Sequence, residues 1–305
     1  MRRLAPALVL LAAAGLAGCG LASGTGGGDA RVLVTRDFGS ETLGARIVQD
    51  VPSSATAMRL LERGFKVSSR AGDVQTIDGL AGGREGGRPV DWFLYVNGVE
   101  SEQGAASVDV HGGDRVWWDR HDRNAAPHVP AVVGSFPEPF LHGAGGKRIP
   151  LVLECADDVD AACGTVQSRL SAAGAIAARQ LPGTGAGERT LRVLVGTWSE
   201  IHGDAALEQL DRGPRVSGVF ARFGDSGRSL ALLDATGAVA QVRGAGTGLV
   251  AATRFEQQAP TWAITGTDVA GVAAAARALD ERTLQAHFAL AIDPGGDVPL
   301  PLQRR

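Results

Sequence analysis

Short apolar runs in the first half of the chain alternate with polar residues at the period of two that is typical of strands. Residues 31–35 form a β-branched run, and residues 92–96 form the strongest strand prediction. Asn97-Gly98 follows directly and predicts a tight hairpin turn, because both central residues of that turn need positive φ. A further turn at residues 112–114 leads into a last predicted strand over residues 115–118.

The segment between these strands predicts one helix and two short strands. Apolar residues with helical spacing run from residue 57 to 61, and Gly64 is a typical stop. Ser53 or Ser54 is expected to cap the helix. Residues 65–67 and 74–77 are predicted strands. Residues 30–123 therefore form a predicted α+β domain.

The second half of the chain alternates strand and helix patterns. Predicted helices cover residues 163–178 and 269–279, which is typical of an α/β layer with partly parallel strands. Residues 148–305 are accordingly expected to form an α/β domain of unknown role. The predicted strands cover residues 149–153, 191–195, 261–265 and 288–292, with a hairpin or two more strands over residues 216–223 and 230–233.

Residues 124–147 are predicted to connect the two domains. Four prolines and a glycine-rich stretch in this segment disfavour a long helix or a central strand. Its apolar residues 129–133 and 136–141 leave open that it packs against a domain.

The first residues predict export. Arg2 and Arg3 precede an apolar stretch over residues 4–16, which is typical of a secretory signal and shorter than the roughly 20 residues that a membrane span needs. The next residues, Leu16-Ala17-Gly18-Cys19, resemble the lipobox of bacterial lipoproteins. Residues 1–18 are then a signal peptide and Cys19 carries the lipid, whereas an ordinary secretory signal is the alternative. Residues 19–29 form a predicted flexible tether, which places the protein on the extracytoplasmic membrane face as a lipid-anchored protein.

The two remaining cysteines are predicted to pair. Cys155 and Cys163 are an even pair in an oxidising compartment, which favours a disulfide. A metal site is the alternative, but two thiols without a nearby third ligand indicate it only weakly.

Aromatic residues are concentrated in one segment. Residues 92–118 hold three of the five tryptophans and the only tyrosine, although aromatic residues make up only 5% of the chain. Strand alternation places Phe93 and Tyr95 on one face and Trp92 and Leu94 on the other. One aromatic set is expected in a core and the other partly exposed, where it could stack on a flat ligand or contact a partner protein.

The same residues carry a family resemblance. Trp92-Phe93-Leu94-Tyr95-Val96-Asn97-Gly98, followed by Gly113-Asp114-Arg115-Val116-Trp117-Trp118, resembles the transcobalamin C-terminal-like domain family, a group of domains of unknown function in bacterial surface proteins. The resemblance covers residues 30–123, implies a β-grasp fold, and implies a cobalamin-like ligand. The ligand-binding residues expected on this basis are Phe93, Tyr95, Asn97, Trp117 and Trp118.

Other candidate chemistry is weaker. Asp119-Arg120-His121-Asp122, with His128 nearby, could supply metal ligands or an imidazole to a corrinoid cobalt. The spacing matches no defined metal site, and a polar strand end that runs into the connecting segment is the favoured interpretation, so no metal is predicted. The glycine-rich run over residues 244–248 departs from the dinucleotide fingerprint and is interpreted as a flexible turn.

No catalytic residue is predicted. Ser199, Ser226 and Ser229 lack a nucleophile-elbow context, and His202 and His287 are isolated. The formal net charge of −3 without a basic stripe argues against nucleic-acid binding.

The sequence therefore predicts a non-enzymatic binding lipoprotein that captures a cobalamin-like ligand, with a membrane transporter component or an envelope protein as its partner. The alternative is an envelope module that binds another protein or a wall polymer and has no small ligand. An exported hydrolase is the third possibility.

Overall fold

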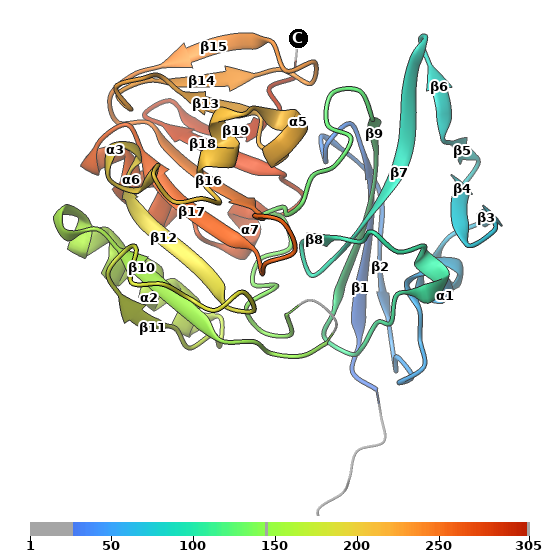
Figure 1. Cartoon of the computed structure of the whole chain (residues 1–305). Helices are drawn as coiled ribbons and strands as arrows, with labels where there is room; N and C mark the ends of the chain where they lie inside the picture. Colours follow the sequence, from blue (N-terminus) through green and yellow to red (C-terminus); the bar gives the residue numbers. More distant parts are fainter. Residues whose placement is uncertain (1–26, 144–145, 304–305) are drawn as a thin grey trace, which may run out of the picture.

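The computed structural model describes residues 27–143 and 146–303 and has a mixed α+β fold, as predicted. Two sheets, one from each half of the chain, stand side by side (Figure 1). The predicted signal peptide, Cys19 and most of the tether lie outside the described residues. Within the described part of the chain, no helix is long and apolar enough to cross a membrane.

The N-terminal sheet has the strand order β2-β1-β9-β7-β6, and the short strand β8 pairs with β7. Strands β1 and β9 are parallel, whereas the other pairs are antiparallel. A second, three-stranded sheet contains β3, β4 and β5. The elements are β1 (Ala30–Arg36), β2 (Glu41–Val48), α1 (Ala57–Gly64), β3 (Val67–Arg70), β4 (Asp73–Ile77), β5 (Leu80–Ala81), β6 (Gly83–Glu85), β7 (Arg88–Val96), β8 (Val99–Glu100), the 3₁₀ turn η1 (Ala105–Ser107) and β9 (Arg115–Asp122).

Helix α1 covers one face of this sheet, and its buried residues Leu60 and Leu61 share a core with Trp92 and Trp118. The predicted caps, Ser53 and Ser54, are wrong. Thr56 has the extended backbone of an N-cap, and its side chain accepts a hydrogen bond from the Arg59 amide at 3.4 Å.

Strand β2 was not predicted from the sequence. It lies at the edge of the sheet and most of its residues are exposed, so its sequence lacks the alternation that marks a half-buried strand.

The C-terminal sheet has the order β11-β10-β12-β17-β16-β18-β19. Its first four strands are parallel, and the remaining neighbours are antiparallel. Residues 216–217, predicted as strand, end a short helix instead. The elements are β10 (Leu151–Cys155), the 3₁₀ turn η2 (Asp157–Val159), α2 (Asp160–Ala172), β11 (Ala178–Gln180), β12 (Leu191–Thr197), α3 (Trp198–Ile201), α4 (Glu208–Asp211), α5 (Pro214–Ser217), β13 (Ala221–Phe223), β14 (Leu230–Leu233), β15 (Val239–Arg243), β16 (Gly248–Thr253), β17 (Thr261–Gly266), α6 (Val269–Arg277), α7 (Glu281–Leu284), β18 (Ala289–Asp293) and β19 (Gly296–Leu300).

Both faces of the C-terminal sheet are covered. Helices α2 and α6 pack on one face with the buried residues of that core. Cys155 at the end of β10 forms a disulfide with Cys163 in α2, with a Cα–Cα distance of 6.0 Å. The predicted pairing is therefore confirmed.

The segment predicted as a connection contains no helix or strand in its described residues, but it is not an exposed tether. Val129 and Val132 are buried in a core together with residues of both sheets. Phe136 and Phe140 contact the Trp262 ring, with centroid distances of 6.2 and 4.9 Å. The segment therefore fills space between the two halves.

The two sheets share one aromatic core. Phe288, just before β18, contacts four rings of the N-terminal half, namely Phe38, Tyr95, Trp117 and His121, with centroid distances between 5.1 and 5.6 Å. Phe288 is 2% exposed. Because this core contains residues from both sheets, we expect the two halves to unfold together.

Truncation of Phe288 tests this coupling. Phe288→Ala should lower the free energy of unfolding by about 3–5 kcal/mol, because it removes a buried ring and leaves a cavity between the sheets. Urea unfolding followed by tryptophan fluorescence and by far-ultraviolet circular dichroism should give one coincident transition in the wild type. Two separate wild-type transitions would show that the shared core does not couple the halves.

Candidate functional site

The aromatic residues predicted to bind a ligand are almost all buried. Tyr95 and Trp117 lie on the face of the N-terminal sheet that meets the C-terminal half, with exposed fractions of 0% and 1%. Trp118 lies on the opposite face, in the core under α1. Phe93 alone among the four is partly exposed. Of the aromatic set expected to be partly exposed, only Phe93 is so, because the C-terminal half covers the face that α1 leaves free.

Asn97 has a structural role. It adopts φ 54° and Gly98 adopts φ 76°, which confirms the predicted hairpin turn. Its side-chain amide donates to an Asp114 carboxylate oxygen and to the Gly143 carbonyl, both at 2.7 Å. Its side-chain oxygen accepts from the Arg115 amide at 2.9 Å. Both amide protons of this buried side chain are thus used within the protein.

A buried polar cluster surrounds Asp119. Its carboxylate accepts hydrogen bonds from the backbone amides of Phe38 and Gly39, at 3.1 and 2.8 Å, and from the Thr35 hydroxyl at 2.5 Å. It also lies 2.7 Å from Nδ1 of His121. Through these hydrogen bonds, the carboxylate of Asp119 in β9 fixes the turn of residues 37–39 to that strand.

His121 is enclosed and cannot meet a ligand at the surface. Its ring is fully buried and stacked between Phe38 and Phe93, with centroid distances of 4.2 and 3.9 Å. His128 is exposed and lies 3.3 Å from a Glu100 carboxylate oxygen. Among the described residues, no group of three His, Cys, Asp or Glu side chains could hold a metal ion.

The other candidate motifs also have structural explanations. In the glycine-rich turn, the Gly246 amide donates to an Asp268 carboxylate oxygen at 2.8 Å, so an acidic side chain occupies the place that a phosphate would need. Ser199 lies beside the Thr197 hydroxyl at 3.0 Å, and His202 contacts the Trp198 carbonyl through Nδ1. His287 is partly buried, and burial lowers its pKa.

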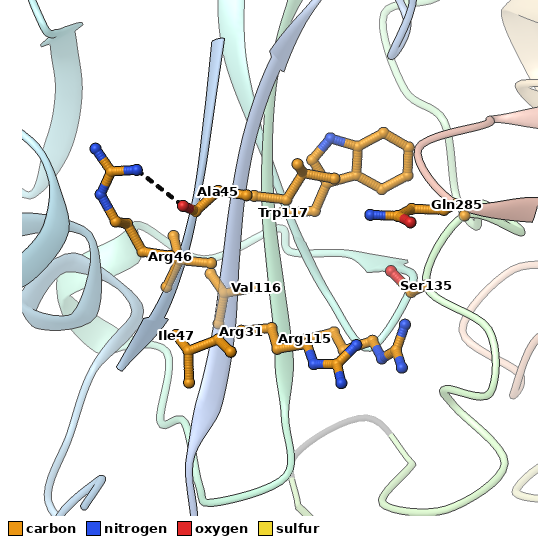
Figure 2. A pocket seen from close by; sticks show the side chains of 12 residues that line it. Arg31, Ala45, Arg46, Ile47, Arg115, Val116, Trp117, Ser135 and Gln285 are labelled. Carbon is orange, nitrogen blue, oxygen red and sulfur yellow. Dashed lines mark hydrogen bonds between the residues drawn. The ribbon is translucent and has the colours of Figure 1, made fainter. Parts of the chain in front are cut away.

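A crevice opens where the N-terminal sheet meets the C-terminal half (Figure 2). We call it the β2 crevice, and its volume is about 340 Å³. It is bounded by β2, β1 and β9 on one side and by two loops of the rest of the chain on the other. Its lining residues are Arg31, Val32, Leu33, Ala45, Arg46, Ile47, Arg115, Val116, Trp117, Gly134, Ser135 and Gln285.

The sheet side of the β2 crevice is largely apolar. Leu33 pairs with Ala45 and with Trp117 in the strand register, so these three side chains share the crevice face. Ile47 lies on the same face of β2 as Ala45 and is 64% exposed. The Trp117 indole extends toward Gln285 across the crevice (Figure 2). An apolar ligand surface would lose water on contact with this wall.

Positive charge gathers at the other end of the crevice. Arg31 and Arg115 both donate to the same Glu281 carboxylate oxygen, each at 2.7 Å. Burial opposes the ionisation of Glu281, but the two arginines outweigh it and hold the pKa of this carboxyl below its usual value. The single negative charge of Glu281 balances only one of the two guanidinium charges. The remaining positive charge can bind an anion.

Two further hollows have a more polar lining. One, of about 480 Å³, lies beside β7 and includes Phe93, Glu100 and His128. The other, of about 730 Å³, lies between β8 and the residue 254–260 loop and is lined by charged and amide side chains of both halves. The larger hollow also has apolar residues and three cationic side chains, but four carboxylates line it as well: Glu100, Glu102, Asp109 and Glu188. Among the described residues, no acidic side chain lines the β2 crevice itself, so the β2 crevice is the stronger candidate for an anion.

Comparison with known proteins gives a partial assignment. The profile of a domain of unknown function (DUF4430) matches residues 54–122. The chain carries a DUF4430 domain. The match begins ahead of α1 and ends with the last residue of β9. No curated protein matches the chain.

Sequence reasoning missed most of this site. Arg31, Ile47, Ser135 and Gln285 come from four distant segments and carry no shared motif. One signal was present: Ile47 is an apolar residue in a polar segment between two turns.

Removal of the Asp119 carboxylate tests the buried cluster. Asp119→Ala should lower the free energy of unfolding by about 3–5 kcal/mol, because it leaves buried donors without an acceptor. Asp91→Ala is the control, since the half-exposed Asp91–Arg123 pair contributes about 0–1 kcal/mol. Equal losses in urea unfolding would contradict a structural role for the cluster.

The buried carboxyl of Glu100 should make stability depend on pH. Burial raises its pKa above the ordinary value of 4.5, although His128 and the Val129 amide act in the opposite direction. A raised folded-state pKa stabilises the fold below the ordinary pKa, and this contribution is lost as pH rises through the folded-state value. Wild-type stability relative to Glu100→Gln should therefore fall between about pH 4 and pH 7. Urea unfolding at both pH values measures this, with the exposed Glu102→Gln as control, and an unchanged difference would contradict it.

Proposed function

We propose that the protein is a lipid-anchored binding protein of the extracytoplasmic membrane face and that the β2 crevice is its ligand site. The anchor rests on the lipobox-like sequence that ends in Cys19. The ligand class rests on one observation, the pairing of an apolar wall with two arginines that share one carboxylate. The ligand is a small molecule or segment with an apolar body and an anionic group.

The dimensions of the crevice bear on the cobalamin hypothesis. A volume of about 340 Å³ lies at the small end of the roughly 300–1,000 Å³ that drug-sized ligands occupy. A corrinoid is much larger and would insert only part of itself. The transcobalamin resemblance supports a capture role, whereas the burial of Tyr95 and Trp117 removes the stacking surface that made a corrin ring attractive. We therefore propose an amphipathic anion, in preference to a corrinoid, as the ligand of the β2 crevice.

A binding role agrees with the rest of the molecule. The crevice lies at the junction of two sheets that a shared core holds together, so its walls keep their spacing without a ligand. A preformed site loses less conformational entropy on binding. A protein held at the membrane by a lipid could pass its ligand to a transporter component or an envelope protein.

Titration with 1-anilinonaphthalene-8-sulfonate, an aromatic anion whose fluorescence rises in apolar surroundings, tests the site. The wild type should bind it saturably, and Ile47→Glu should weaken binding at least about tenfold, or about 1.4 kcal/mol, because a carboxylate then faces the anion. Arg115→Met should weaken it as well. Cobalamin, titrated in parallel by equilibrium dialysis, should bind more weakly than the anion.

Val242→Glu is the matched control. Val242 lies on the edge strand β15 and is 62% exposed, close to the 64% of Ile47, but it is outside the crevice. Equal weakening by Ile47→Glu and Val242→Glu would place the anion elsewhere and contradict the proposed site.

A further inference from the structure

We infer that the natural occupant of the β2 crevice is an extended acidic segment of a partner protein, which pairs with β2 as an added strand. This inference rests on the proposed function and specifies the ligand of that same site. It follows from three properties of β2: its unpaired edge, its exposed apolar side chains, and the positive charge beside it.

The outer edge of β2 is open. Strand β2 is the last strand of its sheet and pairs only with β1, over Glu41–Val48 with a bulge at Leu43. No other described strand pairs with its outer side. An edge strand exposes every second amide and carbonyl, and these groups can pair with an incoming extended chain. Eight residues are enough for a strand of ordinary length.

The crevice face of β2 is unusually apolar for an open edge. Ile47 is 64% exposed and lies with Ala45 on the crevice face, whereas Leu43, which is 40% exposed, lies at a bulge in the strand register and outside the crevice lining. Natural edge strands usually carry charges that discourage pairing. Exposed apolar side chains beside a crevice instead favour contact with alternate side chains of an added strand.

Charge indicates the chemistry of that strand. Arg31 and Arg115 carry the positive charge of the crevice, and Glu281 neutralises part of it. The Arg46 guanidinium instead donates to the Ala45 carbonyl at 2.9 Å and lies 5.2 Å from the centre of the Phe65 ring. The side chain of Arg31 remains 60% exposed and accessible. A segment in which acidic residues alternate with apolar ones would place carboxylates near Arg31 and Arg115 and apolar side chains near Ala45 and Ile47.

The edge strand β15 provides a contrast within the same chain. It also exposes two apolar residues, Val239 and Val242, at 50% and 62%. The hollow at the end of β15 is lined mainly by turn residues and contains one arginine, Arg243, together with Asp293 and Asp297, so it lacks an apolar wall with clustered arginines. Exposed apolar residues on an edge are thus common to both strands, and the crevice distinguishes β2.

A library of short random peptides displayed on phage, selected on the whole protein, provides the test. Enriched peptides should alternate apolar and acidic residues. When synthesised with methyl groups on alternate backbone nitrogens, they should lose at least tenfold in affinity, because methylation blocks strand pairing and keeps the side chains. Ile47→Lys should retain these peptides, Ile47→Glu should lose them, and Val242→Glu should bind them as the wild type does.

Three results would overturn the inference: no enrichment, affinity unchanged by backbone methylation, or equal binding to the wild type and Ile47→Glu. Far-ultraviolet circular dichroism checks the fold of each variant, and Ala45→Glu, at an exposed position of the same crevice face, serves as the second variant if Ile47→Glu fails to fold. Anilinonaphthalene sulfonate binding that depends on Ile47, without peptide pairing, would retain the proposed function and reject only the added strand. Loss of both kinds of binding would reject both proposals.

Discussion

The packing of the N-terminal sheet against the C-terminal half is the contact on which the rest of the structure depends. Phe288 inserts among Phe38, Tyr95, Trp117 and His121, so the two sheets bury one continuous core. A small sheet with a helix on one face needs a cover for the other face. Here the second half of the chain provides that cover.

Because of this packing, the candidate binding site lies at the edge of the N-terminal sheet and not on the aromatic face at its centre, where the sequence predicted it. Tyr95 and Trp117 contribute their area to the core, and Asp119 and Asn97 use their polar groups to hold turns in place. The C-terminal half does not reach across the whole sheet. At β2 the cover ends, and the uncovered margin forms the crevice with its apolar wall and paired arginines.

Local signals allowed much of the fold to be predicted. The Asn97-Gly98 turn, the strands predicted at residues 92–96 and 115–118, and the Cys155–Cys163 disulfide each depend on a few neighbouring residues or on cysteine count. Strand β2 was missed because an exposed edge strand needs no apolar alternation. The helix cap is Thr56 and not Ser53 or Ser54, because three of the four residues 53–56 carry hydroxyl groups and only the backbone path selects among them.

The site was beyond prediction for a different reason. The aromatic motif indicated that residues 92–118 were important, but core packing and ligand stacking require the same residue types. Only the position of the second half decides between them. The crevice joins Arg31, Ile47, Ser135 and Gln285, whose proximity results from the tertiary fold and from no local pattern.

Hydroxyl-radical footprinting of the whole protein tests the central claim most directly, because it reports the solvent exposure of individual side chains. We predict that Tyr95 and Trp117 remain protected while Leu43 and Ile47 are modified readily. Modification of Tyr95 and Trp117 at rates similar to that of Ile47 would show that the two sheets do not share a closed core. The aromatic face of the N-terminal sheet would then again be a candidate binding surface.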